Sequence, residues 1–120
     1  MEDKTILVVD DTVSNLDIMV SFLKEYDVID TIDGEEALEI ANEQKIDLIL
    51  LDIIMPFMDG YEVCKKLKDN PQTRDIPVIF ITAQTDEESI DRAYKMGGID
   101  YITKPFRFQE VLFKVKKELS

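Results

Sequence analysis

The chain has 120 residues and a formal net charge of −12, with no histidine, and we expect residues 1–120 to form a single domain. So acidic a surface argues against direct binding to nucleic acid and to anionic membranes. Because the N-terminus does not resemble a signal peptide and no apolar run is long enough to cross a bilayer, we expect a cytoplasmic protein without membrane contact.

Five short apolar runs alternate along the chain with stretches of helical periodicity. The runs are rich in Val, Ile and Leu without alternation, which is typical of strands buried on both faces of a parallel sheet. In chain order the expected strands are residues 5–10, 28–31, 46–52, 77–81 and 99–102. A helix follows each strand, the first over residues 12–24. This order predicts an α/β fold, a doubly wound five-stranded parallel sheet of order 2-1-3-4-5 in a flavodoxin-like three-layer sandwich.

Polar residues stand at the ends of four of these strands. Asp10 and Asp11 close the first strand, and Asp52 closes the third. In the predicted order these two strands are neighbours, so we expect the three carboxylates to converge at the switch point where such sheets bind ligands. Thr82 and Lys104 end the fourth and fifth runs, and they add a hydroxyl and an ammonium to the same edge.

An acidic cluster of this kind favours one type of chemistry. Oxygen ligands without histidine or thiolate favour a hard ion, and Mg²⁺ in particular also takes phosphate oxygens as ligands. The three carboxylates, Lys104 and a divalent ion sum to zero formal charge, which suits a transferring phosphoryl group. An aspartate can itself be the nucleophile and form an acyl phosphate. Asp52 is the candidate because it stands alone, whereas Asp10 and Asp11 are adjacent and better placed to hold metal.

Taken singly, these residues have ordinary interpretations. Asp11 or Thr12 could cap the following helix, and Asp52 could be a turn residue. Thr82 could be a plain strand-end hydroxyl and Lys104 a solvated surface charge. The combination favours a functional site, because all the polar residues of the cluster fall at the carboxyl ends of predicted parallel strands.

Four motifs extend over essentially the whole chain. They are Val8-Val9-Asp10-Asp11 with Asn15, Leu50 to Pro56 with Asp59-Gly60, Phe80 to Ala83, and Asp100 to Phe106. Together they resemble the receiver domain of two-component response regulators, of the chemotaxis-regulator-like kind. The resemblance implies a phosphorylation-controlled signalling domain that is not an enzyme, except that it catalyses its own phosphorylation and dephosphorylation.

The resemblance also implies a donor and a metal site. The donor would be a phosphohistidine on a sensor histidine kinase or a histidine phosphotransfer protein, and Asp52 would accept the phosphoryl group. Asp10, Asp11 and Asp52 would hold Mg²⁺ together with the backbone carbonyl of Ile54.

Further roles follow from the same resemblance. Thr82 and Lys104 would bind the phosphoryl oxygens, and Tyr101 would be the aromatic switch residue that swings inward when Thr82 moves. Ile54 and Gln84 would border the approach of the hydrolytic water and so tune the lifetime of the phosphorylated state.

The resemblance further implies how the signal leaves the domain. Output to a downstream protein or a fused effector domain would pass through the surface of the fourth helix, fifth strand and fifth helix, where a phosphorylation-dependent dimer is also possible. The Lys104-Pro105 peptide bond would be cis, which proline makes accessible.

Two other classes of protein share parts of this pattern. An aspartate-dependent phosphohydrolase of the haloacid dehalogenase type expects an Asp-x-Asp motif, but Asp52 is followed by Ile53-Ile54. A flavodoxin-like module that binds flavin expects a phosphate-binding loop, but residues 10–15 lack glycine and carry negative charge.

Overall fold

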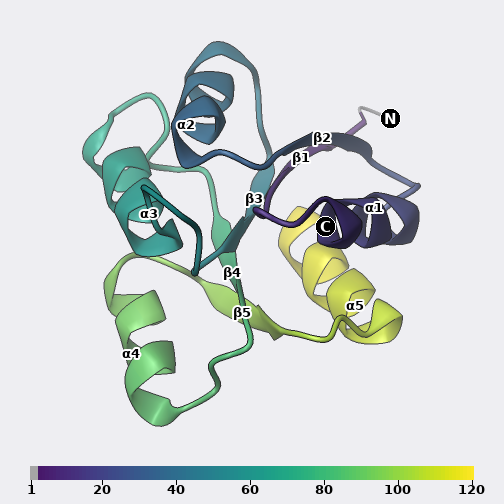
Figure 1. Cartoon of the computed structure of the whole chain (residues 1–120). Coiled ribbons are helices and arrows are strands. Elements are labelled where there is room, and N and C mark those ends of the chain that lie inside the picture. The colour runs from purple at the N-terminus through teal and green to yellow at the C-terminus, as the bar shows by residue number, and fades with distance from the viewer. Residues whose placement is uncertain (1–2) are drawn as a thin grey trace.

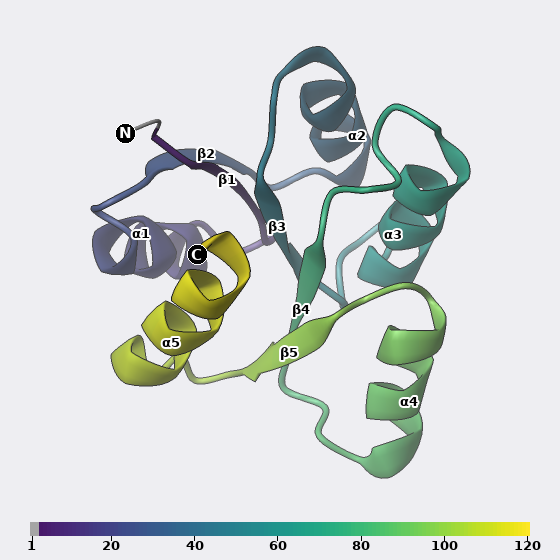
Figure 2. The same cartoon turned by 180° about the vertical axis from the view of Figure 1, so that it is seen from behind.

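A computed structural model describes residues 3–120 and shows a parallel five-stranded sheet between two layers of helices (Figures 1 and 2). The strand order is β2-β1-β3-β4-β5, so the predicted fold class and topology are confirmed. The strands are β1 Thr5–Val9, β2 Asp27–Thr31, β3 Leu48–Asp52, β4 Val78–Thr82 and β5 Asp100–Thr103. The helices are α1 Val13–Phe22, α2 Gly34–Glu43, α3 Gly60–Asp69, α4 Glu87–Lys95 and α5 Phe108–Leu119.

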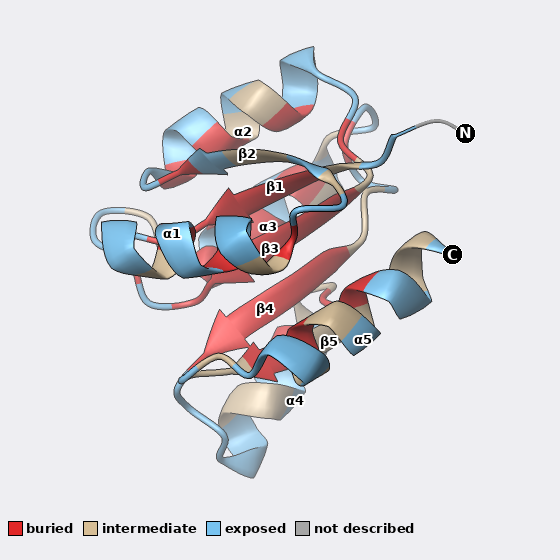
Figure 3. Cartoon of the chain, turned by 90° about the vertical axis from the view of Figure 1, so that its right-hand side faces the viewer, coloured by how far each residue is buried: buried red, intermediate tan, exposed pale blue. Residues whose placement is uncertain are grey.

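The centre of the sheet supplies most of the core. Strands β3 and β4 are buried along their whole length, and β1 nearly so, which explains their unbroken apolar sequence (Figure 3). Pairing Val9 with Leu51 brings the carboxyl ends of β1 and β3 level with each other. Pairing Thr82 with Thr103 does the same for β4 and β5. Functional side chains at these ends therefore share one edge of the sheet.

Each face of the sheet has its own helical layer. Helices α1 and α5 cover one face, whereas α2, α3 and α4 cover the other (Figures 1 and 2). The buried residues of the first layer are Leu16, Met19, Val111 and Val115. Those of the second layer are Ala37, Ala41, Tyr61, Val63, Cys64, Leu67 and Ala93. Because both faces of the sheet are covered, the polar groups of the central strands β1, β3 and β4 lie at the strand ends.

Local sequence sets most of the helix ends. Aspartates cap α2, α3 and α4, where their side chains accept backbone N–H groups of the first turn; the caps are Asp33, Asp59 and Asp86. Helix α1 ends two residues before the predicted position, because the N–H of Leu23 bonds back to the carbonyls of Met19 and Val20 and the chain turns into β2. Within residues 3–120, no helix combines the length and the apolar character needed to cross a membrane.

Candidate functional site

Three carboxylates meet beyond the carboxyl ends of β1 and β3. Oxygen atoms of Asp10, Asp11 and Asp52 all lie within 4.8 Å of one another. Asp10 and Asp52 are buried, whereas Asp11 is exposed. The convergence predicted from strand order is therefore confirmed, because the two strands are hydrogen-bonded neighbours in register.

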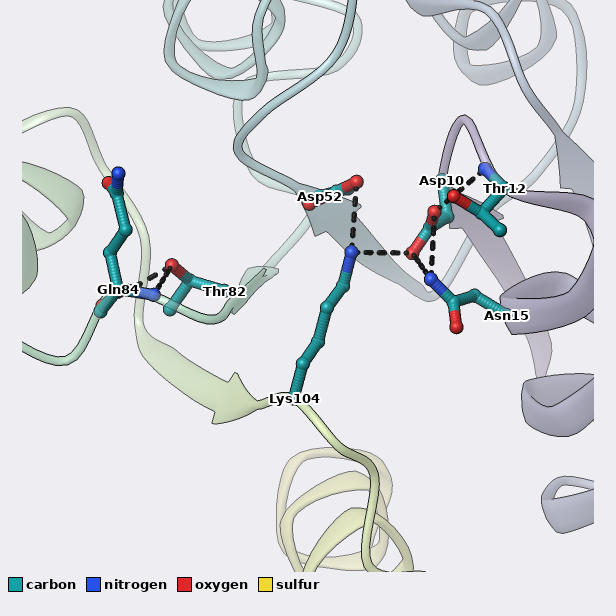
Figure 4. A network of polar contacts seen from close by, with 7 residues as sticks. All are labelled: Asp10, Thr12, Asn15, Asp52, Thr82, Gln84 and Lys104. Atoms are coloured by element: carbon teal, nitrogen blue, oxygen red, sulfur yellow. Dashed lines mark hydrogen bonds and ion pairs between the residues drawn. The ribbon is translucent and has the colours of Figure 1, made fainter.

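Asp10 is fixed in place by its own loop. Its Oδ1 accepts the backbone N–H of Thr12 at 2.9 Å, and both carboxylate oxygens lie 3.3 to 3.4 Å from the side-chain amide of Asn15 (Figure 4). Thr12 is the N-cap residue of α1, but its side chain makes no capping hydrogen bond. Here the turn into the helix is held by the buried carboxylate.

Lys104 brings a positive charge to this cluster from the far side of β4. Its Nζ lies 3.2 Å from Oδ2 of Asp52 and 3.3 Å from Oδ2 of Asp10 (Figure 4). The side chain is only 23% exposed, so it is not a solvated surface charge. The peptide bond between Lys104 and Pro105 is cis, as the resemblance implied.

The buried oxygen of Asp52, Oδ2, has no hydrogen bond. Among the described residues, no other buried side-chain oxygen or nitrogen lacks a hydrogen-bond partner. The contact with Lys104 is close enough for an ion pair but lacks the alignment of a hydrogen bond. A buried carboxylate oxygen in this condition is costly unless a cation or a donor satisfies it. With two further carboxylates within 4.8 Å, the donor set fits a hard divalent ion such as Mg²⁺.

Burial and the neighbouring charges set the pKa of Asp52. Burial, followed by repulsion from Asp10, raises the pKa of Asp52 to about 7, even though Lys104 acts to lower it and Asp11 raises it further. Burial lowers the pKa of Lys104, but the carboxylates of Asp52 and Asp10 outweigh that effect and raise it. Lys104 therefore keeps its charge at neutral pH, whereas the surroundings of Asp52 oppose its ionisation unless further positive charge is present.

Thr82 lies at the same edge but is turned away from the carboxylates. Its hydroxyl accepts the N–H of Gln84 at 2.8 Å and lies 3.2 Å from the carbonyl of the same residue (Figure 4). The structure therefore does not bring the Thr82 hydroxyl into the network of Asp52 and Lys104. Ile54 and the side chain of Gln84 are exposed in the loops that follow β3 and β4.

Tyr101 stands on β5, half-buried, beside Phe80 of β4. Its ring is close to α4 on one side and α5 on the other, through Tyr94 and Lys114. Tyr101 therefore lies on the edge strand next to β4, which ends at Thr82, and it contacts both flanking helices.

Sequence reasoning missed two features of the loop between β3 and α3. A Cβ atom on Gly60 would lie 2.2 Å from the backbone oxygen of Asp52, so only glycine lets the loop fold back onto the strand end. Phe57 has a positive φ of 69°, and the N–H of Met58 bonds to the carbonyl of Pro56 at 2.8 Å. The Asp59-Gly60 pair signals a turn, but no residue type at position 57 indicates a left-handed backbone.

Known proteins match this chain along most of its length. A family model described as the response regulator receiver domain matches residues 6–116. The alkaline phosphatase synthesis transcriptional regulatory protein PhoP of Bacillus subtilis is 43% identical over 116 residues, which cover 95% of this chain and 48% of that protein. A probable cyclic di-GMP phosphodiesterase of Vibrio cholerae is 45% identical over 102 residues, which cover 84% of this chain and 23% of that protein.

A solved structure supports the same assignment. The receiver domain of the sensor histidine kinase PA1611 from Pseudomonas aeruginosa, with a magnesium ion coordinated in its active site cleft, matches with a TM-score of 0.88. The two sequences are 28% identical, and the match covers 97% of each chain. This chain spans about half the length of PhoP and about a quarter of the phosphodiesterase. These matches favour the receiver interpretation over the haloacid dehalogenase one.

Proposed function

This chain belongs to the receiver domain family of two-component response regulators, and we propose that Asp52 is its phosphoacceptor. The observation that carries the proposal is the buried Asp52 carboxylate at the end of the central strand, 3.2 Å from the Lys104 ammonium. Its Oδ2, which has no hydrogen bond, and the neighbouring Asp10 and Asp11 complete an acidic pocket suited to phosphoryl transfer.

The reaction is a transfer from a phosphohistidine on a sensor histidine kinase or a histidine phosphotransfer protein. A carboxylate oxygen of Asp52 forms a bond to phosphorus as the bond from phosphorus to the donor imidazole nitrogen breaks, and the imidazole leaves with the bonding electron pair. Only ionised Asp52 can attack, so neighbouring positive charge favours the step. Lys104 supplies part of that charge.

The metal site is formed by Asp10, Asp11, Asp52 and the backbone carbonyl of Ile54. Mg²⁺ held there would supply positive charge to offset the carboxylates and to stabilise a transferring phosphoryl group. The contacts of Asp10 with Thr12 and Lys104 hold its carboxylate in position. Asp11 is exposed, so it can adjust its side chain to a ligand at little cost to the fold.

Phosphorylation then changes the partners of two further residues. The Lys104 ammonium pairs with a phosphoryl oxygen, and the Thr82 hydroxyl leaves the backbone of Gln84 to donate to another. Tyr101 moves inward as Thr82 moves. These exchanges form a two-state switch, because the phosphoryl group contacts Thr82 in one state and not in the other.

The family carries out signalling rather than turnover of a substrate, and we assign this chain no catalysis beyond its own phosphorylation and dephosphorylation. We propose that residues 1–120 act in the cytoplasm as one receiver unit. Output goes to a downstream protein or a fused effector domain, with a possible phosphorylation-dependent dimer through α4, β5 and α5. The net charge of −12 supports protein partners over direct contact with nucleic acid or membrane.

Labelling with a small phosphodonor tests this proposal without a partner protein. Phosphoramidate and Mg²⁺ should add one phosphoryl group, detected by intact mass spectrometry and mapped to Asp52. Asp52→Asn should lose the label, whereas Asp69→Asn, at an exposed acid on α3, should keep it. Asp11→Asn should need more Mg²⁺ for the same rate. Equal labelling of Asp52→Asn, or labelling insensitive to a chelator, would contradict the assignment.

A further inference from the structure

The ring of Tyr101 is held from two sides. The Nζ of Lys114 on α5 lies 4.8 Å from the ring centroid, close enough for a cation–π contact. On α4, the ring of Tyr94 approaches edge to face, with centroids 6.5 Å apart and planes at 82°. In this orientation the ring therefore has an ammonium and an aromatic neighbour at once.

Lys114 is itself anchored independently of that ring. Its ammonium lies 3.3 Å from Oδ1 of Asp100 and donates to the backbone carbonyl of Tyr101, and its side chain is only 20% exposed. Neither anchor moves when the Tyr101 side chain rotates about its Cα–Cβ bond. Lys114 would thus stay where it is while the ring turns away, so the cation–π contact belongs to the present orientation alone.

Thr82 is the other residue whose contacts change in the proposed switch. The hydroxyl of Thr82 is bonded to the backbone of Gln84, two residues further along the chain. The orientation of Tyr101 that Lys114 contacts therefore occurs together with a Thr82 hydroxyl bonded to the Gln84 backbone, the contact that Thr82 gives up on phosphorylation in the function proposed above.

We propose that Lys114 is a positioning residue that stabilises the resting orientation of Tyr101 and so opposes the response to phosphorylation. This inference rests on the function proposed above, in which Tyr101 moves inward as Thr82 is recruited. A contact made in only one of two states shifts the equilibrium by the full strength of that contact. Removing the ammonium should therefore populate the inward orientation before any phosphoryl group arrives.

Beryllofluoride, a mimic of the phosphoryl group, gives the test in the presence of Mg²⁺. The chain is labelled with 3-fluorotyrosine, the Tyr101 resonance is assigned from a Tyr101→Phe variant, and fluorine spectra follow a beryllofluoride titration. In Lys114→Met the starting resonance should move toward its saturated position, and the midpoint should fall about threefold to tenfold. Sedimentation at the same concentration must show a monomer, so that self-association does not alter the midpoint.

Matched variants separate this contact from other effects of the substitution. Lys116→Met, on the same helix at an exposed lysine that pairs with Glu25, should leave the midpoint unchanged. Lys114→Arg keeps both charge and ring contact, so its midpoint should stay within about twofold of the parent. In a Tyr101→Ala background, where the titration is followed through the remaining fluorotyrosines such as Tyr94, Lys114→Met should have no effect on the midpoint.

The outcomes that overturn the inference differ from those that overturn the proposed function. An equal midpoint in the parent and Lys114→Met refutes the role of Lys114, as does a shift that persists in Tyr101→Ala. Should Lys114→Met fail to fold, a midpoint that rises in Lys114→Gln, or stays the same, refutes it equally. If the parent itself does not bind beryllofluoride with Mg²⁺, the proposed function fails and the inference fails with it.

Discussion

The Nζ atom of Lys104 lies 3.2 Å from Oδ2 of Asp52, although the strands that precede these residues, β5 and β3, are separated in the sheet by β4. The lysine side chain therefore reaches past the end of a strand to join the acidic cluster. The same ammonium also lies 3.3 Å from Oδ2 of Asp10. Burial and repulsion from Asp10 raise the pKa of Asp52 to about 7, and a single positive charge beside two buried carboxylates does not offset them.

Replacing Lys104 with methionine should lower the free energy of unfolding of the metal-free chain at pH 8. The substitution leaves Asp10 and Asp52 without their positive neighbour, and we expect a loss of about 1 to 3 kcal/mol. Lys104→Arg keeps the positive charge, so its free energy of unfolding should fall by less. Urea unfolding in the presence of a chelator measures the difference. The loss should shrink in an Asp52→Asn background, and an undiminished loss there would show that the ion pair is not its cause.

Removing the charge of Asp52 should instead raise the free energy of unfolding of the metal-free chain, by an amount that depends on pH. The pKa of Asp52 is raised from 3.8 in the unfolded chain to about 7 in the folded chain. Between pH 3.8 and pH 7 the folded chain therefore binds a proton that the unfolded chain does not, so the parent loses stability as the pH rises through this range. Without metal, the free energy of unfolding of Asp52→Asn should equal that of the parent near pH 4. The variant should become steadily more stable than the parent up to pH 7, and above pH 7 the difference should stay constant at about 2 kcal/mol.

Urea unfolding across this pH range, with a chelator present, tests the prediction. Asp69→Asn, at an exposed acid that pairs with Lys65, is the control and should show no such trend. A gain for Asp52→Asn that is constant from pH 4 to pH 8 would mean that packing of the amide, and not loss of ionisation, stabilises the variant.

Much of the architecture could be predicted from the sequence because strong local signals agreed with the topology. Unbroken apolar runs identify strands buried on both faces, and parallel strands align their carboxyl ends. That logic alone predicted that Asp10, Asp11 and Asp52 would converge, and the structure bears it out. The cis bond before Pro105 came from family resemblance, since no local pattern distinguishes it.

Other features depend on side-chain and loop geometry that a sequence pattern does not encode. Strand order predicts that Lys104 reaches the acidic edge, but not that its ammonium lies between two carboxylates. Nor does it predict that the Thr82 hydroxyl turns toward the Gln84 backbone. The positive φ of Phe57 arises from the closure of a short loop over a strand end, which is a tertiary constraint that overrides residue preference.

Phe57 offers a test of that constraint. Its φ of 69° and the hydrogen bond from Met58 N–H to Pro56 carbonyl are those of a classical γ-turn, which is strained for a residue with a Cβ. The ring is fully exposed, so little packing is lost on its removal. Phe57→Gly should therefore be more stable than Phe57→Ala by about 1 kcal/mol, the reverse of the usual order.

A helical position on α3 supplies the comparison. Lys66 is exposed within that helix, and there Lys66→Ala should be more stable than Lys66→Gly by a similar amount of about 1 kcal/mol. Urea unfolding of the four variants measures both differences. If alanine is also favoured at position 57, the loop relaxes to an ordinary backbone when the phenyl ring is removed.

The lifetime of phosphorylated Asp52 should depend on the exposed side chains that border it. Ile54 is 58% exposed and apolar, so it can neither bind nor orient a water molecule near the acyl phosphate. Gln84 is polar but cannot act as a general base. Its backbone holds the Thr82 hydroxyl while its side chain is exposed, so substitution there should not disturb the loop.

We therefore expect the double variant Ile54→Asn with Gln84→Glu to lose its phosphoryl group at least several-fold faster than the parent, which corresponds to about 1 kcal/mol of barrier. The chain is labelled with phosphoramidate, freed of donor, and followed by intact mass as the label decays. Gln72→Glu, at an exposed position beyond α3, adds the same charge far from the site and should leave the half-life unchanged. Polar side chains at positions 54 and 84 admit and orient the attacking water, so an unchanged or longer half-life in the double variant would refute the shielding role of Ile54.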